Sequence, residues 1–476
     1  MNAFDGLRRK AHGLVDKYFD EQIRDTREII KIPSVLDESG ATPENIFGSD
    51  MTSALNAFLG IAESMGFRVK NIENRIGYAE VGCGAEMAGI LAHLDVVPAG
   101  RLEEWTHPPF GAVVEDGVLW GRGAIDDKGP AMATLYAMKS LRDAGAAFSR
   151  RFRLILGLDE ENGSRCIERY NEVEEQPAFS FSPDASFPVV NAEKGILRLI
   201  FSKRAADSRP VNQPALSGLS GGDRFNVVPD FASAFIRCGL DDRESIAKYF
   251  AGLDVSEEPD GLCVKAYGLA AHAMEPEKGE NAIQKLLRRL SGVKFCDSDS
   301  ETIGSLRRLF GDDSAGKGLD IAARDDVSGH LTCNTAAIET RHDGDGYKTF
   351  VIKLDIRYPV TLGAPRLIED IRQKSSRSGY ELEIAAHKPP LFVPESDPVV
   401  QTLLDSYECV MNERPAPISM GGGTYCRFMP HSVSAGPVFP GQPELAHQTD
   451  ERVSLDDLRR CTHIYAEALA RFNDAN

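Results

Sequence analysis

The chain has 476 residues, more than one hydrophobic core usually serves, so we expect two domains. Its net charge of −18 at pH 7 is unfavourable for binding nucleic acid or anionic membranes. No apolar run approaches the roughly 20 residues of a membrane span, and residues 1–5 do not predict a secretory signal. The nine cysteines include no Cys-x-x-Cys pair, which is typical of reduced thiols, so a cytoplasmic protein is expected.

Apolar periodicity in the first third of the chain predicts helices and strands in alternation. Residues 8–31 carry a helical apolar stripe, and Pro33 ends that helix. Residues 88–97 form a continuous apolar run that is typical of a buried strand. A helical stripe follows at 132–141, and alternating apolar residues at 151–158 predict another strand with one apolar face. Strand, helix and strand in this order predict a parallel sheet with helices outside it.

The pattern changes in the middle of the chain. Residues 203–224 are rich in charged residues, serine and glycine, and we expect a loop of a second, inserted domain. Alternation returns at 350–357, which predicts a strand. A helix is predicted at 397–411, where an Asp-Pro pair supplies a cap and a proline at the first helical position. Ser454, with an aspartate three residues later, predicts the start of the last helix.

His93 and Asp95 lie where the first predicted strand ends. Their side chains share a face, because alternate residues of a strand point the same way. A carboxylate beside a metal-bound histidine fixes its tautomer and raises its basicity. Taken alone, the pair also fits a core histidine next to a solvated aspartate.

Residues 121–130 read Gly-Arg-Gly-Ala-Ile-Asp-Asp-Lys-Gly-Pro, with Asp126 and Asp127 between the glycines. Glycines allow the backbone to pass close to an ion. One carboxylate can bridge two cations through its two oxygens. The string is specific enough to favour a metal ligand over a charged turn.

Three more motifs add acidic or imidazole groups. Glu160 and Glu161 follow the strand at 151–158, so one can bind a metal while the other acts as a base. Asp184 has apolar neighbours, which favours a buried, paired carboxylate, and His447 follows Leu445-Ala446. Each motif alone also fits an acidic loop or a structural histidine. Two imidazoles and three of these carboxylates would form a ligand set that suits Zn²⁺, or Mn²⁺ or Co²⁺.

In this order, the motifs resemble those of the M20 metallopeptidase family, and within it the PepV-type bacterial dipeptidases. The metal motifs carry the resemblance to the family, and later matches favour the dipeptidase branch. These later matches lie at 225–229, 281–282, 331–334, 355–359 and 421–425. The resemblance covers nearly the whole chain.

The resemblance implies a role for each motif. One metal would be bound by His93, Asp126 and Asp184, and the other by Asp126, Glu161 and His447. Glu160 would be the general base, and Asp95 would orient His93. The peptide between Asp126 and Asp127 would be cis.

The resemblance also implies substrate-binding residues outside the metal motifs. His272 would stabilise the oxyanion, and it would come from the inserted domain together with Asn226 and Arg357. The substrate carboxylate would be held by Arg357 and by a turn that includes Gly422, Gly423 and Thr424. This assignment suits arginine, which holds a carboxylate with two parallel hydrogen bonds.

The fold implied is α/β, with a mixed-sheet zinc-peptidase catalytic domain and an inserted α+β lid domain. We place the catalytic domain at 1–190 and 386–476, because the metal motifs stop at Asp184 and resume at His447. The lid would be 191–385, which is long enough for two sub-domains, so a monomer is expected.

The expected function is that of a metal-dependent dipeptidase that hydrolyses small peptides with water activated by two divalent metal ions. Two alternatives stay open: an N-acyl-amino-acid or succinyl-diaminopimelate deacylase, and a non-catalytic, metal-bound peptide-binding protein. Two positions depart from the family pattern. Residues 270–273 read Ala-Ala-His-Ala where serine and glycine usually flank the histidine, and Cys426 replaces a usual alanine.

Overall fold

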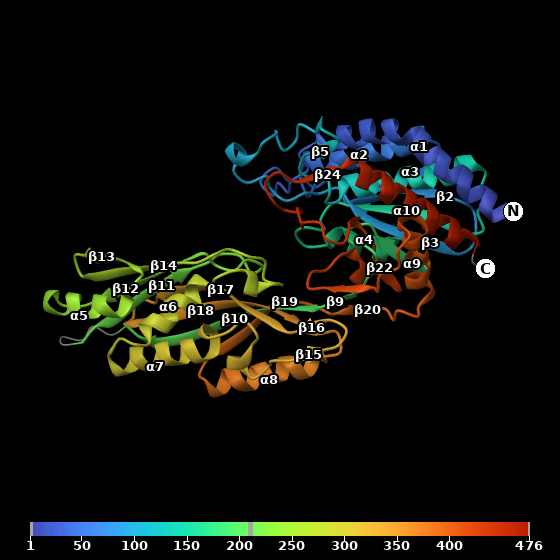
Figure 1. The fold of residues 1–476 in the computed structure, drawn as a ribbon. Helices are drawn as coiled ribbons and strands as arrows, with labels where there is room; N and C mark the ends of the chain where they lie inside the picture. Colours follow the sequence, from blue (N-terminus) through green and yellow to red (C-terminus); the bar gives the residue numbers. More distant parts are fainter. Residues whose placement is uncertain (1–2, 208–212, 475–476) are drawn as a thin grey trace. The chain divides into compact units, whose positions relative to one another are not determined.

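A computed structural model describes residues 3–207 and 213–474 and shows a mixed α/β fold, which confirms the predicted fold class (Figure 1). The chain forms two compact units. Unit 1 comprises Met1–Ala192, Phe392–Ile418 and Gly423–Asn476, and unit 2 comprises Glu193–Leu391 and Ser419–Gly422. Among the residues described, no helix is long and apolar enough to cross a membrane. That the units act as a catalytic domain and a lid stays a prediction.

Unit 1 is built on a mixed sheet. β3 (Met87–His93) lies between β6 (Arg151–Gly157) and β7 (Phe179–Ser182) and is parallel to both. β7 is also parallel to β22 (Ser432–Ser434). The sheet continues at one side through antiparallel pairs to β2 (Ile76–Val81) and β1 (Arg68–Ile72). At the other side β22 is antiparallel to β9 (Val190–Glu193), and β9 pairs in turn with β20 (Leu391–Phe392) and β21 (Ile418–Met420).

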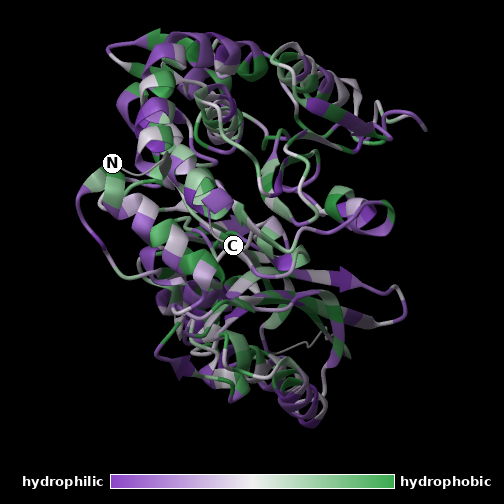
Figure 2. Cartoon of the chain, turned by 90° about the vertical axis from the view of Figure 1, so that its right-hand side faces the viewer, coloured by the Kyte–Doolittle hydropathy of each residue, from purple (hydrophilic) through white to green (hydrophobic). Residues whose placement is uncertain are grey.

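The helices of unit 1 bury the apolar stripes that the sequence predicts. α1 (Ala3–Ile30) and α10 (Leu455–Asp474) both pack against α3 (Lys128–Ala144), and Val15 and Phe19 of α1 are buried. Figure 2 shows hydrophilic and hydrophobic residues on the same helices, as expected for amphipathic elements. Asp397 caps α9 (Pro398–Met411), as predicted, by accepting a hydrogen bond from the Val399 N–H. The remaining helices of this unit are α2 (Ser49–Ser64) and α4 (Arg165–Val173).

Two small sheets join distant segments of unit 1. β24 (Arg452–Ser454) pairs with β5 (Val118–Trp120), which pairs with β4 (Val113–Glu115). β8 (Ala185–Ser186) pairs with β23 (Pro437–Val438). The first pairing places the segment after His447 beside the 121–130 string.

Unit 2 is built on an antiparallel sheet with a core on one face. Alternate residues of β10 (Gly195–Ala206) and β18 (Tyr347–Tyr358) enter this core, among them Leu199 and Leu354. Helices α6 (Ala282–Leu290), α7 (Asp297–Leu306) and α8 (Ala364–Arg377) pack against the sheet. The other strands of this sheet are β11 (Ala215–Gly221), β12 (Phe231–Arg237), β13 (Asp254–Glu258), β14 (Gly261–Tyr267), β17 (Thr332–His342) and β19 (Glu381–Lys388). Unit 2 also contains a short helix, α5 (Arg243–Ala247), and a separate two-stranded sheet of β15 (Arg324–Asp325) and β16 (Gly329–His330).

One local expectation was wrong, and another was incomplete. The stretch 203–224 is not one loop, because β10 extends to Ala206 and β11 begins at Ala215; residues 208–212 lie outside the described part. The strand at 151–158 has the predicted apolar face, but its opposite face is buried as well. After Arg151 every residue of β6 is buried, because this strand lies inside the sheet between β2 and β3.

Candidate metal centre

Neighbouring parallel strands of unit 1 place three of the motifs at one edge of the sheet. β3 ends at His93, which is the register partner of Gly157 at the end of β6. The Glu160-Glu161 turn follows β6, and Asp184 follows β7. Asp126 lies on the loop that enters α3. Ligands of open α/β sheets collect at this carboxyl edge of the strands.

The five predicted metal ligands converge there. His93 Nε2 lies 2.9 Å from Asp126 Oδ1 and 3.6 Å from Asp184 Oδ2. His447 Nε2 lies 3.1 Å from Asp126 Oδ2 and 2.9 Å from Glu161 Oε1. Each oxygen of Asp126 therefore faces a different histidine, as a carboxylate that bridges two cations requires.

The donor set fits a pair of divalent cations. Nε2 of His93 is buried and forms no hydrogen bond of acceptable geometry with any described residue, so a strong ligand atom points into the acidic cluster. Two groups of three residues each bring their potential ligand atoms within 4.8 Å of one another. One group is His93, Asp126 and Glu161, and the other is His93, Glu160 and Asp184. Imidazole and carboxylate donors at these separations suit first-row transition metals.

The charges of the cluster are strongly coupled. Burial and the nearby negative charge of Asp126 raise the pKa of Asp184 to about 8 and that of Glu161 to about 7. Burial acts to lower the pKa of His447, but Asp126 and Glu161 outweigh it and raise that pKa to about 12. Three carboxylates thus compete for positive charge in a buried place, which is the environment that a divalent cation would stabilise.

Asp95 makes contacts that the resemblance did not imply. Nδ1 of His93 lies 2.9 Å from the main-chain carbonyl oxygen of Asp95, whereas the Asp95 carboxylate is 3.5 Å from that nitrogen. The two carboxylate oxygens instead accept hydrogen bonds from the backbone N–H groups of Glu160 at 3.2 Å and Glu161 at 3.1 Å. Asp95 is fully buried and so holds the turn that carries both glutamates.

Two buried residues near the site were missed by sequence reasoning. Glu451 accepts hydrogen bonds from the loop that carries Asp126, and Arg122 donates to Glu451. Arg122 lies inside the 121–130 string and Glu451 lies four residues after His447, and this closeness to predicted ligands was the only available signal. The peptide between Asp126 and Asp127 is cis, as the resemblance implied, and Asp127 accepts a hydrogen bond from the His93 N–H at 3.1 Å.

The predicted residues of the inserted domain lie in unit 2. Asn226 and His272 are on paired segments: Val227 bridges His272, and the Ala273 N–H donates to the Asn226 carbonyl at 2.9 Å. Gly422 also belongs to unit 2, whereas Gly423 and Thr424 belong to unit 1. Cys426 is buried, with its Sγ 3.4 Å from Ser434 Oγ.

Arg357 is held by three of its five N–H donors. Nε and Nη2 donate to the two carboxylate oxygens of Asp355, and Nη1 donates to the Gly421 carbonyl at 3.0 Å. The other two donors of this guanidinium have no partner among the described residues.

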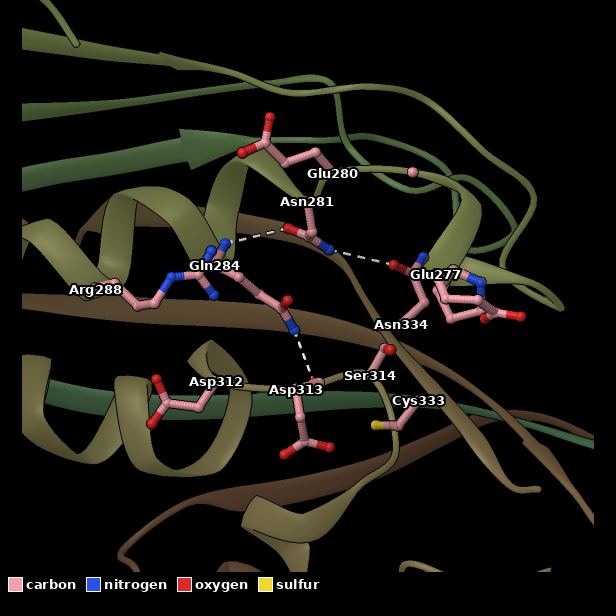
Figure 3. A pocket seen from close by; sticks show the side chains of 12 residues that line it. Glu277, Glu280, Asn281, Gln284, Arg288, Asp312, Asp313, Ser314, Cys333 and Asn334 are labelled. Atoms are coloured by element: carbon pink, nitrogen blue, oxygen red, sulfur yellow. Dashed lines mark hydrogen bonds between the residues drawn. The ribbon is translucent and has the colours of Figure 1, made fainter. Parts of the chain in front are cut away.

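A pocket of about 250 Å³ in unit 2 lies at the start of α6 and has a polar lining (Figure 3). Asn281 donates to Asn334, which in turn donates to the Val227 carbonyl at 2.8 Å. The lining includes none of the predicted site residues. The hydrogen bonds of Asn281 and Asn334 nevertheless link this pocket to the segment that carries Asn226.

Comparison with known proteins agrees with the motifs. The model of peptidase family M20/M25/M40 matches residues 89–471. "Putative dipeptidase YtjP" of Bacillus subtilis (strain 168) is 38% identical over 459 residues, which is 94% of this chain and 96% of that protein. "Putative dipeptidase MW1694" of Staphylococcus aureus (strain MW2) is 31% identical over 96% of this chain and 97% of its own length.

The fold is similar to that of human carnosine dipeptidase 1, with a TM-score of 0.61 and 14% identity over 98% of this chain and 99% of that chain. At this identity the similarity shows the fold alone. The family match spans most of the chain, and the first relative covers nearly all of it. The chain therefore belongs to peptidase family M20/M25/M40 and is a metallopeptidase.

Proposed function

We propose that this metallopeptidase is a dipeptidase whose site holds two divalent cations, most simply Zn²⁺, with Mn²⁺ or Co²⁺ as chemically similar occupants. The observation that carries the proposal is the position of Asp126 between His93 and His447, with one carboxylate oxygen directed at each. His93, Asp126 and Asp184 would hold one cation, and Asp126, Glu161 and His447 the other. The names of the relatives, which describe them as dipeptidases, support the substrate class.

The two cations would lower the pKa of a water molecule towards neutrality and polarise the scissile carbonyl. Glu160 would take a proton from the attacking water on its side-chain carboxylate and deliver it to the leaving amine. Asp95 supports this role, because its carboxylate fixes the backbone N–H of Glu160. General acid–base transfer of this kind typically contributes about 10²–10⁴-fold in rate.

The proposal assigns the substrate carboxylate to Arg357, with Asn226, Gly422, Gly423 and Thr424 as further substrate-binding residues and His272 as the oxyanion donor. Support for Arg357 comes from its hydrogen bonds. Asp355 fixes the plane of the guanidinium, and two N–H donors remain for a ligand. We also propose that the enzyme acts as a monomer.

A substrate panel on Zn²⁺-reconstituted enzyme tests the activity. The substrates are Ala-Leu, acetyl-Ala-Leu, N-acetyl-leucine and succinyl-diaminopimelate, each with and without a chelator. We expect chelator-sensitive hydrolysis of Ala-Leu and much slower hydrolysis of the three acylated compounds. Faster release of an acyl group would assign the enzyme to the deacylases instead. Tight binding of Ala-Leu without turnover would support a peptide-binding protein.

A further inference from the structure

Glu451 is a fully buried carboxylate whose partners lie on the loop that carries Asp126. Its Oε1 accepts hydrogen bonds from the backbone N–H groups of Gly123 at 2.9 Å, Ile125 at 3.0 Å and Asp126 at 3.2 Å. Its Oε2 accepts a hydrogen bond from Arg122 Nη1 at 2.6 Å. One side chain therefore fixes three amides of this loop, including that of Asp126 itself.

The same residue lies four positions after His447 in the sequence. The Gly121 N–H donates to the Glu451 carbonyl at 3.0 Å, and β24 continues from there by pairing with β5. Arg122 Nη2 lies 3.4 Å from the main-chain carbonyl oxygen of His447. Side-chain and backbone contacts thus join the loop of Asp126 to the loop of His447.

Glu467 offers a comparison within unit 1. Its carboxylate is also buried, but its partners are the side chains of Arg8, His12 and Arg471, which tie α10 to α1 and to itself. None of these residues belongs to the cluster. Glu467 therefore stabilises the packing of helices. Glu451 instead contacts the backbone of the loop that carries Asp126, and it contacts Arg122, which lies beside His447.

We infer that Glu451, together with Arg122, is a clamp that fixes Asp126 and His447 relative to each other and thereby sets the affinity for the metal that these two ligands share. Glu451 acts through the ligands and is a positioning residue. The inference rests on the proposed metal centre. Removal of a residue that orients a metal ligand typically weakens metal affinity by about 10–100-fold.

Glu451→Gln is the direct test, because it keeps the volume and one acceptor oxygen but turns an NH₂ group towards either the loop amides or Arg122. Glu467→Gln is the matched control, since it also neutralises a buried glutamate of unit 1. Metal-free wild type and both variants are titrated with Zn²⁺ against a chelating indicator at pH 8. Two dissociation constants are extracted for each protein.

We expect Glu451→Gln to weaken one of the two Zn²⁺ sites by about 10–100-fold and to change the other much less. Glu467→Gln should bind both ions as the wild type does, although it is less stable. Equal affinities in Glu451→Gln and wild type would overturn the inference, as would equal losses in both variants. A wild-type chain that binds no Zn²⁺ would contradict the proposed function itself.

A measurement on the wild type keeps the inference testable if Glu451→Gln does not fold. In the metal-free protein, the amides of Gly123, Ile125 and Asp126 should exchange their hydrogens slowly, because Glu451 holds them without help from a metal. Fast exchange at these three amides, with slow exchange in β3 and β6, would overturn the clamp.

Discussion

Glu160 and Glu161 are adjacent in the chain but differ in their surroundings. Glu161 Oε1 lies 2.9 Å from His447 Nε2, whereas Glu160 forms a group with His93 and Asp184. We expect Glu160→Gln to retain bound metal and lose about 10²–10⁴-fold in kcat, because only the base is removed. Glu161→Gln should lose metal first. Metal content by mass spectrometry, measured with kcat, separates the two roles; equal losses of both in the two variants would show that the roles are shared.

Asp95 gives a second prediction for a single residue. In Asp95→Asn, an amide group replaces one of the two oxygens that accept from Glu160 and Glu161, so the turn loses a hydrogen bond. We expect kcat to fall by about 10–100-fold. Metal binding by His93 should persist, because its Nδ1 is held by the main-chain carbonyl of residue 95. Loss of metal without a change in the kcat of reloaded enzyme would mean that the carboxylate serves His93 instead.

Among the elements, the junction of α1 and α10 depends on Glu467. Burial acts to raise the pKa of this carboxyl, but His12 and Arg8 outweigh it and lower that pKa to about 2 from an ordinary value of 4.5. A carboxyl whose pKa is depressed on folding stabilises the protein above its unfolded pKa, and this contribution is lost as the pH falls. The contribution of Glu467 should be complete above pH 4.5 and disappear towards pH 2.

Glu467→Gln tests this reasoning. At pH 7 we expect the metal-free variant to unfold with a free energy about 2–4 kcal/mol below that of the wild type, since it leaves the half-buried guanidinium groups of Arg8 and Arg471 without their carboxylate. The difference should shrink as the pH falls from 4.5 towards 2. Denaturant unfolding at several pH values measures it. A difference that is independent of pH would show that the charge of Glu467 does not contribute.

The elements also show what sequence patterns can and cannot predict. The strands at β3 and β6 and the helix α3 were predictable because long apolar periods mark buried faces. The end of β10 could not be predicted from the sequence pattern. Lys203 is half-buried and Arg204 is exposed there, so the apolar alternation is lost, although backbone pairing with Phe350 and Thr349 of β18 continues. Strand pairing of this kind depends on a partner far away in the sequence.

The candidate site, like the fold, was predictable only in part. Metal ligands were found because imidazoles and carboxylates recur after apolar runs in a recognisable order. Glu451 was not found, because its partners are backbone amides more than 300 residues earlier in the chain, and an amide has no signature in the sequence. Likewise, the carboxylate of Asp95 was expected to serve His93 rather than the amides of a distant turn.

At the scale of the whole molecule, we expect a single chain to be sufficient for activity. Sedimentation velocity at assay concentrations should give one species near the 52.0 kDa of the chain. Specific activity should stay constant as the enzyme is diluted, because no subunit contact is lost. A fall in specific activity on dilution, with a matching shift from dimer to monomer, would contradict the monomer proposal.

The central claim is that residues from the first and the last chain segments of unit 1 bind two metal ions, and that hydrolysis depends on these ions. The most direct measurement is the rate of Ala-Leu hydrolysis by metal-free enzyme as Zn²⁺ is added in steps at enzyme concentrations well above the dissociation constants. We predict almost no turnover without metal and a rise that stops at two equivalents per chain. Full turnover in the metal-free protein, or a rise that stops at one equivalent, would contradict the claim.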